Sequence, residues 1–140
     1  MKPTTGATPL ASLDAVAIDS ETTSLDTSVA RIVELAAVAL RGGNRYETLV
    51  DPGVAIPAAS SKVHGITAET VAGAPRFPAA LAAFQEFLGS RVLIGYSIGY
   101  DLAILEKEAA RAGLAWKKPR SLCVRLLATL TNPSLPVLRK

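Results

Sequence analysis

The sequence predicts one α/β domain built on a mixed β-sheet. Apolar runs of strand length come first, within residues 14–50, and strand–helix units follow from about residue 78, an order typical of this fold class. The 140 residues, 49% of them hydrophobic, suffice for one substantial core. Residues 1–12 contain Thr, Pro and Gly without periodicity, which predicts a flexible leader. We therefore expect the domain to occupy residues 13–140.

Three strands are expected in the first part of the chain, over residues 14–19, 30–40 and 44–50. The second is mostly apolar, as expected of a strand that is covered on both faces. The Gly-Gly-Asn segment at 42–44 is a turn signal between the second and third strands, so a hairpin is predicted. A loop containing Pro and Ser is expected to continue to about residue 66.

Helix and strand signals alternate in the second part of the chain. A Thr cap predicts a short helical turn over 67–71, and a Pro start predicts an amphipathic helix over 79–88. A short buried strand over 91–95 precedes a helix over 100–112, and a last helix is expected over 121–131. On the helix over 100–112 the expected inward residues are Leu102, Leu105 and Ala109, and the expected outward residues are Glu106, Lys107 and Glu108.

Charge is unevenly distributed along the chain, although the net charge is only +3. Residues 111–140 carry seven basic residues and no acidic ones. A basic segment beside an acidic site suits a ligand with a phosphate backbone. The alternative is a basic helix face in contact with solvent, or a tail whose acidic partners lie elsewhere. The nucleic-acid interpretation and this alternative both stay open.

Neither a secretory signal nor an apolar stretch long enough for a bilayer is evident. The single cysteine, Cys123, rules out an internal disulfide and favours a reducing compartment. Its neighbours are apolar, so we expect it to be a small buried hydrophobe. The sequence thus predicts a cytoplasmic protein without a membrane partner.

Asp19 and Glu21 are the most informative pair in the sequence, because they follow an apolar strand-like run. Side chains alternate along a strand, so positions two apart point the same way and lie roughly 7 Å apart. Two such carboxylates repel each other unless a cation lies between them, and hard divalent ions prefer oxygen ligands. The alternative is a strand that runs into a loop, where Asp, Ser and Thr are ordinary turn residues.

A second acidic position, Asp101, follows the short strand over 91–95 and opens a helix. A carboxylate in the first turn of a helix is favoured by the unpaired N–H groups there. The functional interpretation is a third metal ligand, with Tyr96 and Tyr100 offering flat faces to a base or sugar. Ordinary packing of the two tyrosines is the alternative.

Three segments resemble motifs of the DEDD-superfamily 3′–5′ exonucleases, the family of the proofreading epsilon subunit. Residues 17–25 resemble its first motif, commonly D-x-E-T-T-G-L, with Ser24 in place of the usual Gly. Residues 63–67, Val-His-Gly-Ile-Thr, resemble its next stretch. Residues 94–102 resemble the second motif, which often reads G-H-N-x-x-F-D. The resemblance runs in order from about residue 12 to the end of the chain.

This resemblance implies a ribonuclease-H-like fold, with helices flanking the mixed sheet. It also implies that Asp19, Glu21 and Asp101 are catalytic and hold two Mg²⁺ or Mn²⁺ ions, which together stabilise the attacking and leaving oxygens of a phosphodiester. The implied substrate is the 3′ end of single-stranded DNA or RNA, and a DNA polymerase subunit is a further implied partner. The implied nucleotide-binding residues are Thr22, Thr23, Leu25 as an apolar wedge, His64 and Tyr100.

The family's third motif, which supplies a fourth carboxylate and a general base, has no counterpart here. The 39 residues after Asp101 include neither Asp nor His. The sole histidine, His64, belongs to the second matching segment and is a poor candidate for the base. We therefore expect a domain that is incomplete at its C-terminus, with reduced or absent turnover and exposed apolar surface near Leu126, Leu130 and Leu138. A catalytically inactive nucleic-acid-binding or polymerase-associated module remains the alternative to an active exonuclease.

Overall fold

The computed structural model describes residues 9, 12–132 and 134. The leader predicted over residues 1–12 falls almost entirely outside the described residues and stays a prediction. Within the described part of the chain, no helix is both long enough and apolar enough to cross a membrane.

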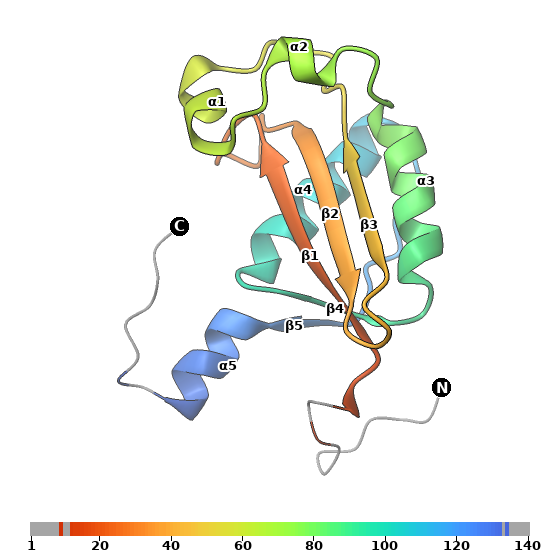
Figure 1. Cartoon of the computed structure of the whole chain (residues 1–140), viewed down its shortest axis with the longest axis vertical. Coiled ribbons are helices and arrows are strands. Elements are labelled where there is room, and N and C mark those ends of the chain that lie inside the picture. The colour runs from red at the N-terminus through yellow and green to blue at the C-terminus, as the bar shows by residue number, and fades with distance from the viewer. Residues whose placement is uncertain (1–8, 10–11, 133, 135–140) are drawn as a thin grey trace.

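The described strands form one five-stranded mixed sheet in the order β3-β2-β1-β4-β5 (Figure 1). The central strand β1 pairs antiparallel with β2 and parallel with β4, while β3 and β5 lie at the edges. The β2–β3 hairpin and the mixed sheet confirm the predicted fold class. The bounds of the strands are β1 Ala15–Thr22, β2 Ile32–Ala39, β3 Arg45–Leu49, β4 Val92–Gly95 and β5 Ser121–Cys123.

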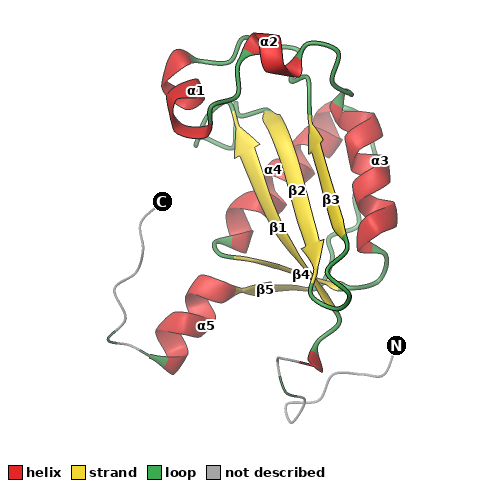
Figure 2. Ribbon diagram, viewed as in Figure 1, coloured by secondary structure: helices red, strands yellow, loops and turns green. Residues whose placement is uncertain are grey.

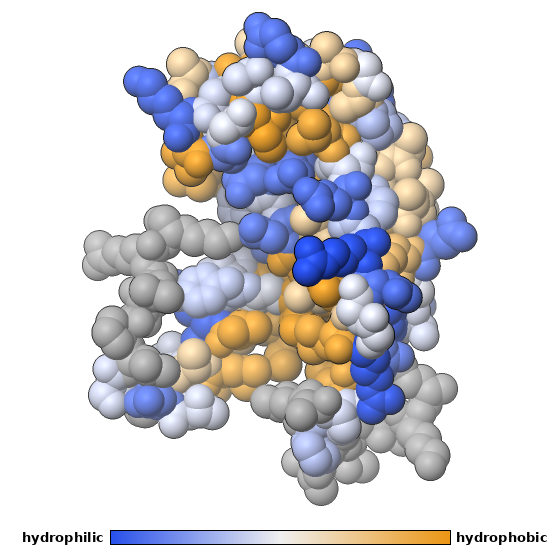
Figure 3. Space-filling model, viewed as in Figure 1, coloured by the Kyte–Doolittle hydropathy of each residue, from blue (hydrophilic) through white to orange (hydrophobic). Residues whose placement is uncertain are grey.

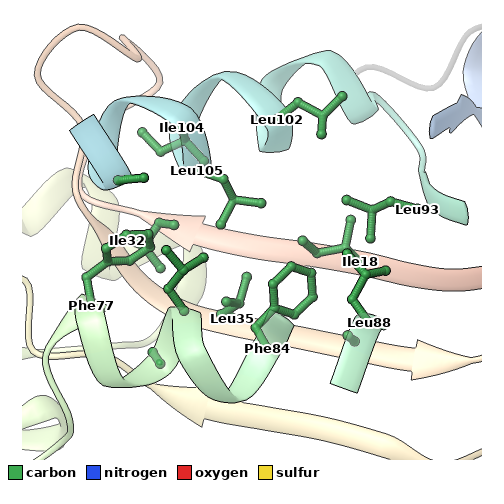
Figure 4. Packing of buried hydrophobic residues seen from close by; sticks show 14 of the residues in the cluster. Ile18, Ile32, Leu35, Phe77, Phe84, Leu88, Leu93, Leu102, Ile104 and Leu105 are labelled. Carbon is green, nitrogen blue, oxygen red and sulfur yellow. The ribbon is translucent and has the colours of Figure 1, made fainter. Parts of the chain in front are cut away.

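Two helices, α3 (Phe77–Leu88) and α4 (Ile98–Arg111), pack on one face of the sheet. In the view of Figure 2, α4 passes behind the strands and α3 stands beside β3. Their apolar stripes meet alternate side chains of β1 and β2 and form the main core (Figure 4). Phe84 is fully buried there, and Tyr46 from β3 donates a 2.8 Å hydrogen bond to the Ala80 carbonyl of α3. The periodicity of the sequence predicted this layer correctly, because burial on one stripe is what stabilises these helices.

The opposite face of the sheet is not covered by a described helix. The last helix, α5 (Val124–Thr131), leads away from the sheet, and none of its residues is buried (Figure 1). Leu126 is 59% exposed and Leu130 is 78% exposed, which confirms the expectation for these two positions. Leu138 lies outside the described residues.

Two short helices, α1 (Ala58–His64) and α2 (Ala68–Val71), cross the end of the sheet where β1 terminates (Figure 1). The capping box of α2, between Thr67 and Thr70, confirms the predicted cap. The loop prediction was wrong for α1. This helix buries none of its residues, so it shows no apolar periodicity, and Gly65 ends it in a left-handed conformation with φ of 76°.

The other boundary errors come from strand pairing. The prediction ended the first strand at Asp19, but β1 continues to Thr22 because β2 pairs with it across the acidic motif. The prediction of a helix from residue 121 was wrong for its first three positions. Residues 121–123 instead pair with β4 as β5. Cys123 packs against the core but is only half-buried, and its Sγ donates to the Tyr96 carbonyl over 3.3 Å.

Glu108 corrects the expected packing of α4, because it points inward and is only 2% exposed. Arg31 Nε lies 2.5 Å from its Oε1 and Arg111 Nη1 lies 3.4 Å from the same oxygen. Arg111 also donates to the carbonyls of Ala30 and Ser28, at 2.8 and 2.7 Å. A buried carboxylate needs such partners, and the partner that lies far away in sequence, Arg31, could not be identified before the fold was known.

Candidate active site

Asp19 and Glu21 lie on the open face of the sheet, as the alternation along β1 predicts. Val16 and Ile18 point into the core beneath α3 and α4, so the odd-numbered residues point the other way. Asp19 is exposed and Glu21 is half-buried. Figure 3 views this open face, with hydrophilic side chains across its middle and hydrophobic ones toward β5 and α5.

Asp101 reaches the same strand from the other side. It lies in the first turn of α4 and is 5% exposed. Ser20, between the two acidic residues of β1, donates a 2.7 Å hydrogen bond from Oγ to Asp101 Oδ1. This buried bond fixes one oxygen of the Asp101 carboxylate against the acidic end of β1. No local pattern indicates Ser20 as a partner of Asp101, because the two residues are 81 positions apart.

Glu34 is a further acidic residue of the open face that the sequence analysis missed. It lies directly opposite Glu21 in the antiparallel β1–β2 register, and directly opposed residues in such a pair interact. Burial raises the pKa of Glu34, and the negative charges of Glu47, Glu21 and Asp19 raise it further, while His64 lowers it. The face thus carries excess negative charge. An alternation of inward and outward residues in the predicted strand over 30–40 would have placed Glu34 outward.

Replacing Glu34 with Gln is expected to raise the melting temperature of the metal-free protein at neutral and alkaline pH. A carboxyl group whose folded pKa is raised costs stability once pH rises above its ordinary value of 4.5, and this cost is complete above the raised pKa. The gain should vanish near pH 3, where the group is protonated in both the folded and the unfolded state. Thermal melts in EDTA check this, with Glu86→Gln on the exposed side of α3 as the matched control. A lower melting temperature for Glu34→Gln at about pH 8 would contradict this account of the charge.

The predicted nucleotide-binding residues of the first motif form the end of β1 and the loop after it. Thr22 and Thr23 are buried, at 8% and 6% exposure, whereas Leu25 is 88% exposed. Thr23 is fixed by Arg31, whose backbone N–H donates to Thr23 Oγ1 at 3.0 Å, and by Ser60 of α1, whose hydroxyl donates to the Thr23 carbonyl at 2.8 Å. An exposed Leu on a fixed loop is consistent with the predicted apolar wedge.

Tyr100 joins this loop from α4. Its hydroxyl lies 2.6 Å from Thr22 Oγ1, and it donates to the Ser24 carbonyl at 2.8 Å. The structure therefore brings Tyr100 together with Thr22 and with the residue that precedes Leu25.

His64 ends α1 beside the open face of the sheet. Its Nδ1 accepts a 3.0 Å hydrogen bond from the backbone N–H of Ile66, so in the neutral ring the proton lies on Nε2. Nε2 is buried and has no hydrogen-bond partner among the described residues. Because Nδ1 is engaged by the backbone, His64 holds the turn after α1.

The residues present suit a divalent cation, although the predicted three-ligand set stays a prediction. Asp19 and Glu21 present oxygen donors on a face with excess negative charge, and hard cations prefer such donors. In the described part of the chain, however, no group of three or more His, Cys, Asp or Glu side chains gathers closely enough to hold a metal ion.

Comparison with known proteins settles the family. A family model described as "Exonuclease" (RNase_T) matches residues 16–140. The chain belongs to this exonuclease family. The match covers the described sheet except for its first residue, Ala15, and includes the acidic end of β1 and Asp101. It confirms the resemblance to DEDD-superfamily exonucleases.

A curated relative agrees with this family, and solved structures share the fold. The chain is 34% identical over 124 residues to the DNA polymerase III subunit epsilon of Aquifex aeolicus, an alignment that covers 86% of the chain and 61% of that protein. A structure of exonuclease X in complex with 5′ overhanging duplex DNA matches with a TM-score of 0.68 at 22% identity. The match covers 89% of this chain and 68% of the exonuclease X chain. The zinc-bound complex of E. coli exonuclease I with single-stranded DNA matches with a TM-score of 0.69 at 16% identity. That match covers 87% of this chain and 31% of the exonuclease I chain.

The structural matches show a shared fold. The chain spans only 17% to 61% of the lengths of the first curated relatives that it matches. The activities and partners of those longer proteins are therefore hypotheses for this chain.

Proposed function

We propose that the chain is a metal-dependent 3′–5′ exonuclease domain that removes nucleotides from the ends of single-stranded DNA or RNA. The observation that carries this proposal is the arrangement at the end of β1. Asp19 and Glu21 lie on the open face, and Asp101 is bonded from the helix side to Ser20, the residue that separates them in the sequence. Membership of the exonuclease family supports the same reaction class.

Asp19, Glu21 and Asp101 would hold the cation, Mg²⁺ or Mn²⁺. When bound, a divalent cation acts as a Lewis acid on the phosphodiester and lowers the pKa of a water molecule, and a pair of ions stabilises both the attacking and the leaving oxygen. The carboxylates supply the negative charge that attracts the cation. Ser20 keeps one oxygen of Asp101 in place by its 2.7 Å hydrogen bond.

The loop after β1 would bind the terminal nucleotide. Leu25 offers an exposed apolar side chain to a base, and Thr22, Thr23, His64 and Tyr100 lie in the elements around it. Relatives and structural neighbours include a DNA polymerase III subunit and a complex with single-stranded DNA. These support single-stranded ends as substrate and a polymerase subunit as partner.

The test is to incubate the purified chain with a 5′-labelled single-stranded oligonucleotide in Mn²⁺ and to resolve the products by length. Stepwise shortening of the labelled strand, stopped by EDTA and restored by fresh Mn²⁺, is expected for a 3′–5′ exonuclease. A single internal cut, release of the labelled 5′ nucleotide, or products that form in EDTA would count against the proposal. The same substrate in DNA and RNA form measures the preference between them.

A second function, a binding module of the same fold without turnover, is favoured by one observation. Among the described residues, no three His, Cys, Asp or Glu side chains lie close enough together to hold a metal ion. Binding of the oligonucleotide without any shortening in Mn²⁺ or Mg²⁺ would establish this module in place of the enzyme.

A further inference from the structure

The carbonyl of Ser24 is contacted by two hydroxyl groups from different parts of the chain. Thr22 Oγ1 and the Tyr100 hydroxyl each lie 2.8 Å from this oxygen and 2.6 Å from each other. The three oxygens thus form three short contacts, but only the two hydroxyl groups carry a proton to donate. One hydroxyl therefore donates to the Ser24 carbonyl while the other donates either to that carbonyl or to its neighbour hydroxyl. The three oxygens form one unit in which each group depends on the other two.

The chain on the other side of Leu25 is fixed as well. The backbone N–H of Asp26 donates to Ser24 Oγ at 3.1 Å, and Asp26 Oδ1 accepts from the N–H and hydroxyl of Ser28, at 2.9 and 2.6 Å. Arg111, at the far end of α4, donates to the Ser28 carbonyl at 2.7 Å. Helix α4 thus holds the loop at two points, through Tyr100 near its start and through Arg111 near its end.

Leu25 lies between these fixed points, and yet it is 88% exposed. Surface loops are usually more mobile than the elements that they connect. Here the backbone is held in place while the Leu25 side chain stays largely exposed. Holding a contact residue in its bound position lowers the entropy cost of binding. The arrangement is therefore suited to presenting Leu25 to a ligand.

We propose that Tyr100 is a positioning residue. Its hydroxyl fixes the Ser24 carbonyl and so presents Leu25 to the terminal base of the substrate. This inference rests on the proposed function. It adds that a single atom, the hydroxyl oxygen of Tyr100 on α4, controls the affinity for the end of the nucleic acid. The family's second motif usually has Phe at this position, which lacks that oxygen.

The variant that tests this is Tyr100→Phe, which removes that oxygen alone. Binding of a 5′-fluorescein oligothymidylate is measured by anisotropy with Ca²⁺ in place of Mg²⁺, and turnover is measured separately in Mn²⁺. Loss of one such hydrogen bond is expected to raise Kd and KM about three- to tenfold and to leave kcat within about twofold. Hydrogen exchange of the peptide that contains Leu25 should become faster.

Tyr46→Phe is the matched control, because it removes a tyrosine hydroxyl that bonds a carbonyl, at 2.8 Å, in the core beneath α3. It should change stability by a similar amount and leave Kd, KM and the exchange of the loop unchanged. Thr22→Val combined with Tyr100→Phe should change Kd by less than the sum of the single effects, because both act on one unit. Leu25→Ala should weaken binding too, and Tyr100→Phe should add little in that background.

The outcomes separate this inference from the proposed function. If the wild-type chain fails to bind the oligonucleotide, both fall. If the wild-type chain binds but Tyr100→Phe binds equally well, or if its loop exchanges at the wild-type rate, only the role of Tyr100 is overturned. A loss of kcat with unchanged KM would also overturn it, because that result would place the hydroxyl in the chemical step.

Discussion

Replacing Asp19 with Ala is expected to abolish most metal-dependent cleavage while leaving the fold intact. A Lewis-acid cation contributes several kcal/mol of transition-state stabilisation, and each 1.4 kcal/mol corresponds to about tenfold in rate, so the loss should be about 10²- to 10³-fold or more. Asp19 is exposed and its charge is one cause of the raised pKa of Glu34. Because the side chain is exposed, the variant should still fold, which a thermal melt of the metal-free protein checks.

Asp14→Ala is the matched control for Asp19→Ala. Asp14 is an exposed residue just before β1, at the other end of the strand from the acidic motif, and its backbone carbonyl still accepts from Val92 after the substitution. Initial rates of shortening of a labelled oligonucleotide in Mn²⁺ are compared for the parent and both variants. Equal loss in the two variants would indicate a general effect of charge and would contradict a specific role for Asp19.

Replacing Glu108 with Ala is expected to cause the largest loss of stability among single charge substitutions in the domain. Its carboxylate is 2% exposed and is contacted by Arg31 and Arg111. Removing one member of a buried ion pair leaves partly buried cations without a partner and costs about 3–5 kcal/mol. The loss should also loosen the loop before β2, because Arg111 holds the carbonyls of Ser28 and Ala30.

Urea unfolding of Glu108→Ala and Glu106→Ala measures this effect. Glu106 lies two residues earlier on α4 and is exposed, so its substitution should change the unfolding free energy by no more than about 0.5 kcal/mol. If the two variants unfold at similar urea concentrations, the buried ion pair does not stabilise the junction of α4 and β2 as the contacts indicate.

Local patterns predicted most of the framework. The apolar run predicted β2 itself, but the expected cover on both faces was wrong, since burial alternates along this strand. The stripe of α3 carries its own signal, because the burial that stabilises it repeats at the period of a helix. The Gly-Gly-Asn turn carries a different one, because Gly42 and Gly43 adopt positive φ. Helix α1 carries none, since it buries no residue. Strand β5 is only three residues long and exists because β4 pairs with it, which no local pattern reports.

The candidate site was predictable in part for a similar reason. Asp19 and Glu21 share a strand, so their common face follows from alternation alone. Other pairs at the site are made only by the tertiary structure. They depend on the register between strands and on the position of α4, which a single sequence does not contain. These pairs are Ser20 with Asp101, Glu34 with Glu21, and Arg31 with Glu108. Glu108 illustrates the error that results: its charge predicted exposure, and two arginines allowed burial.

The most direct test of the central claim is Mn²⁺ binding followed by electron paramagnetic resonance, which detects free Mn²⁺ and loses signal as the ion binds. The parent chain is titrated beside Asp19→Ala and Asp14→Ala. We predict saturable binding by the parent and by Asp14→Ala, with affinity lost in Asp19→Ala. Equal binding by all three proteins, or none by the parent, would contradict a metal site at the acidic end of β1.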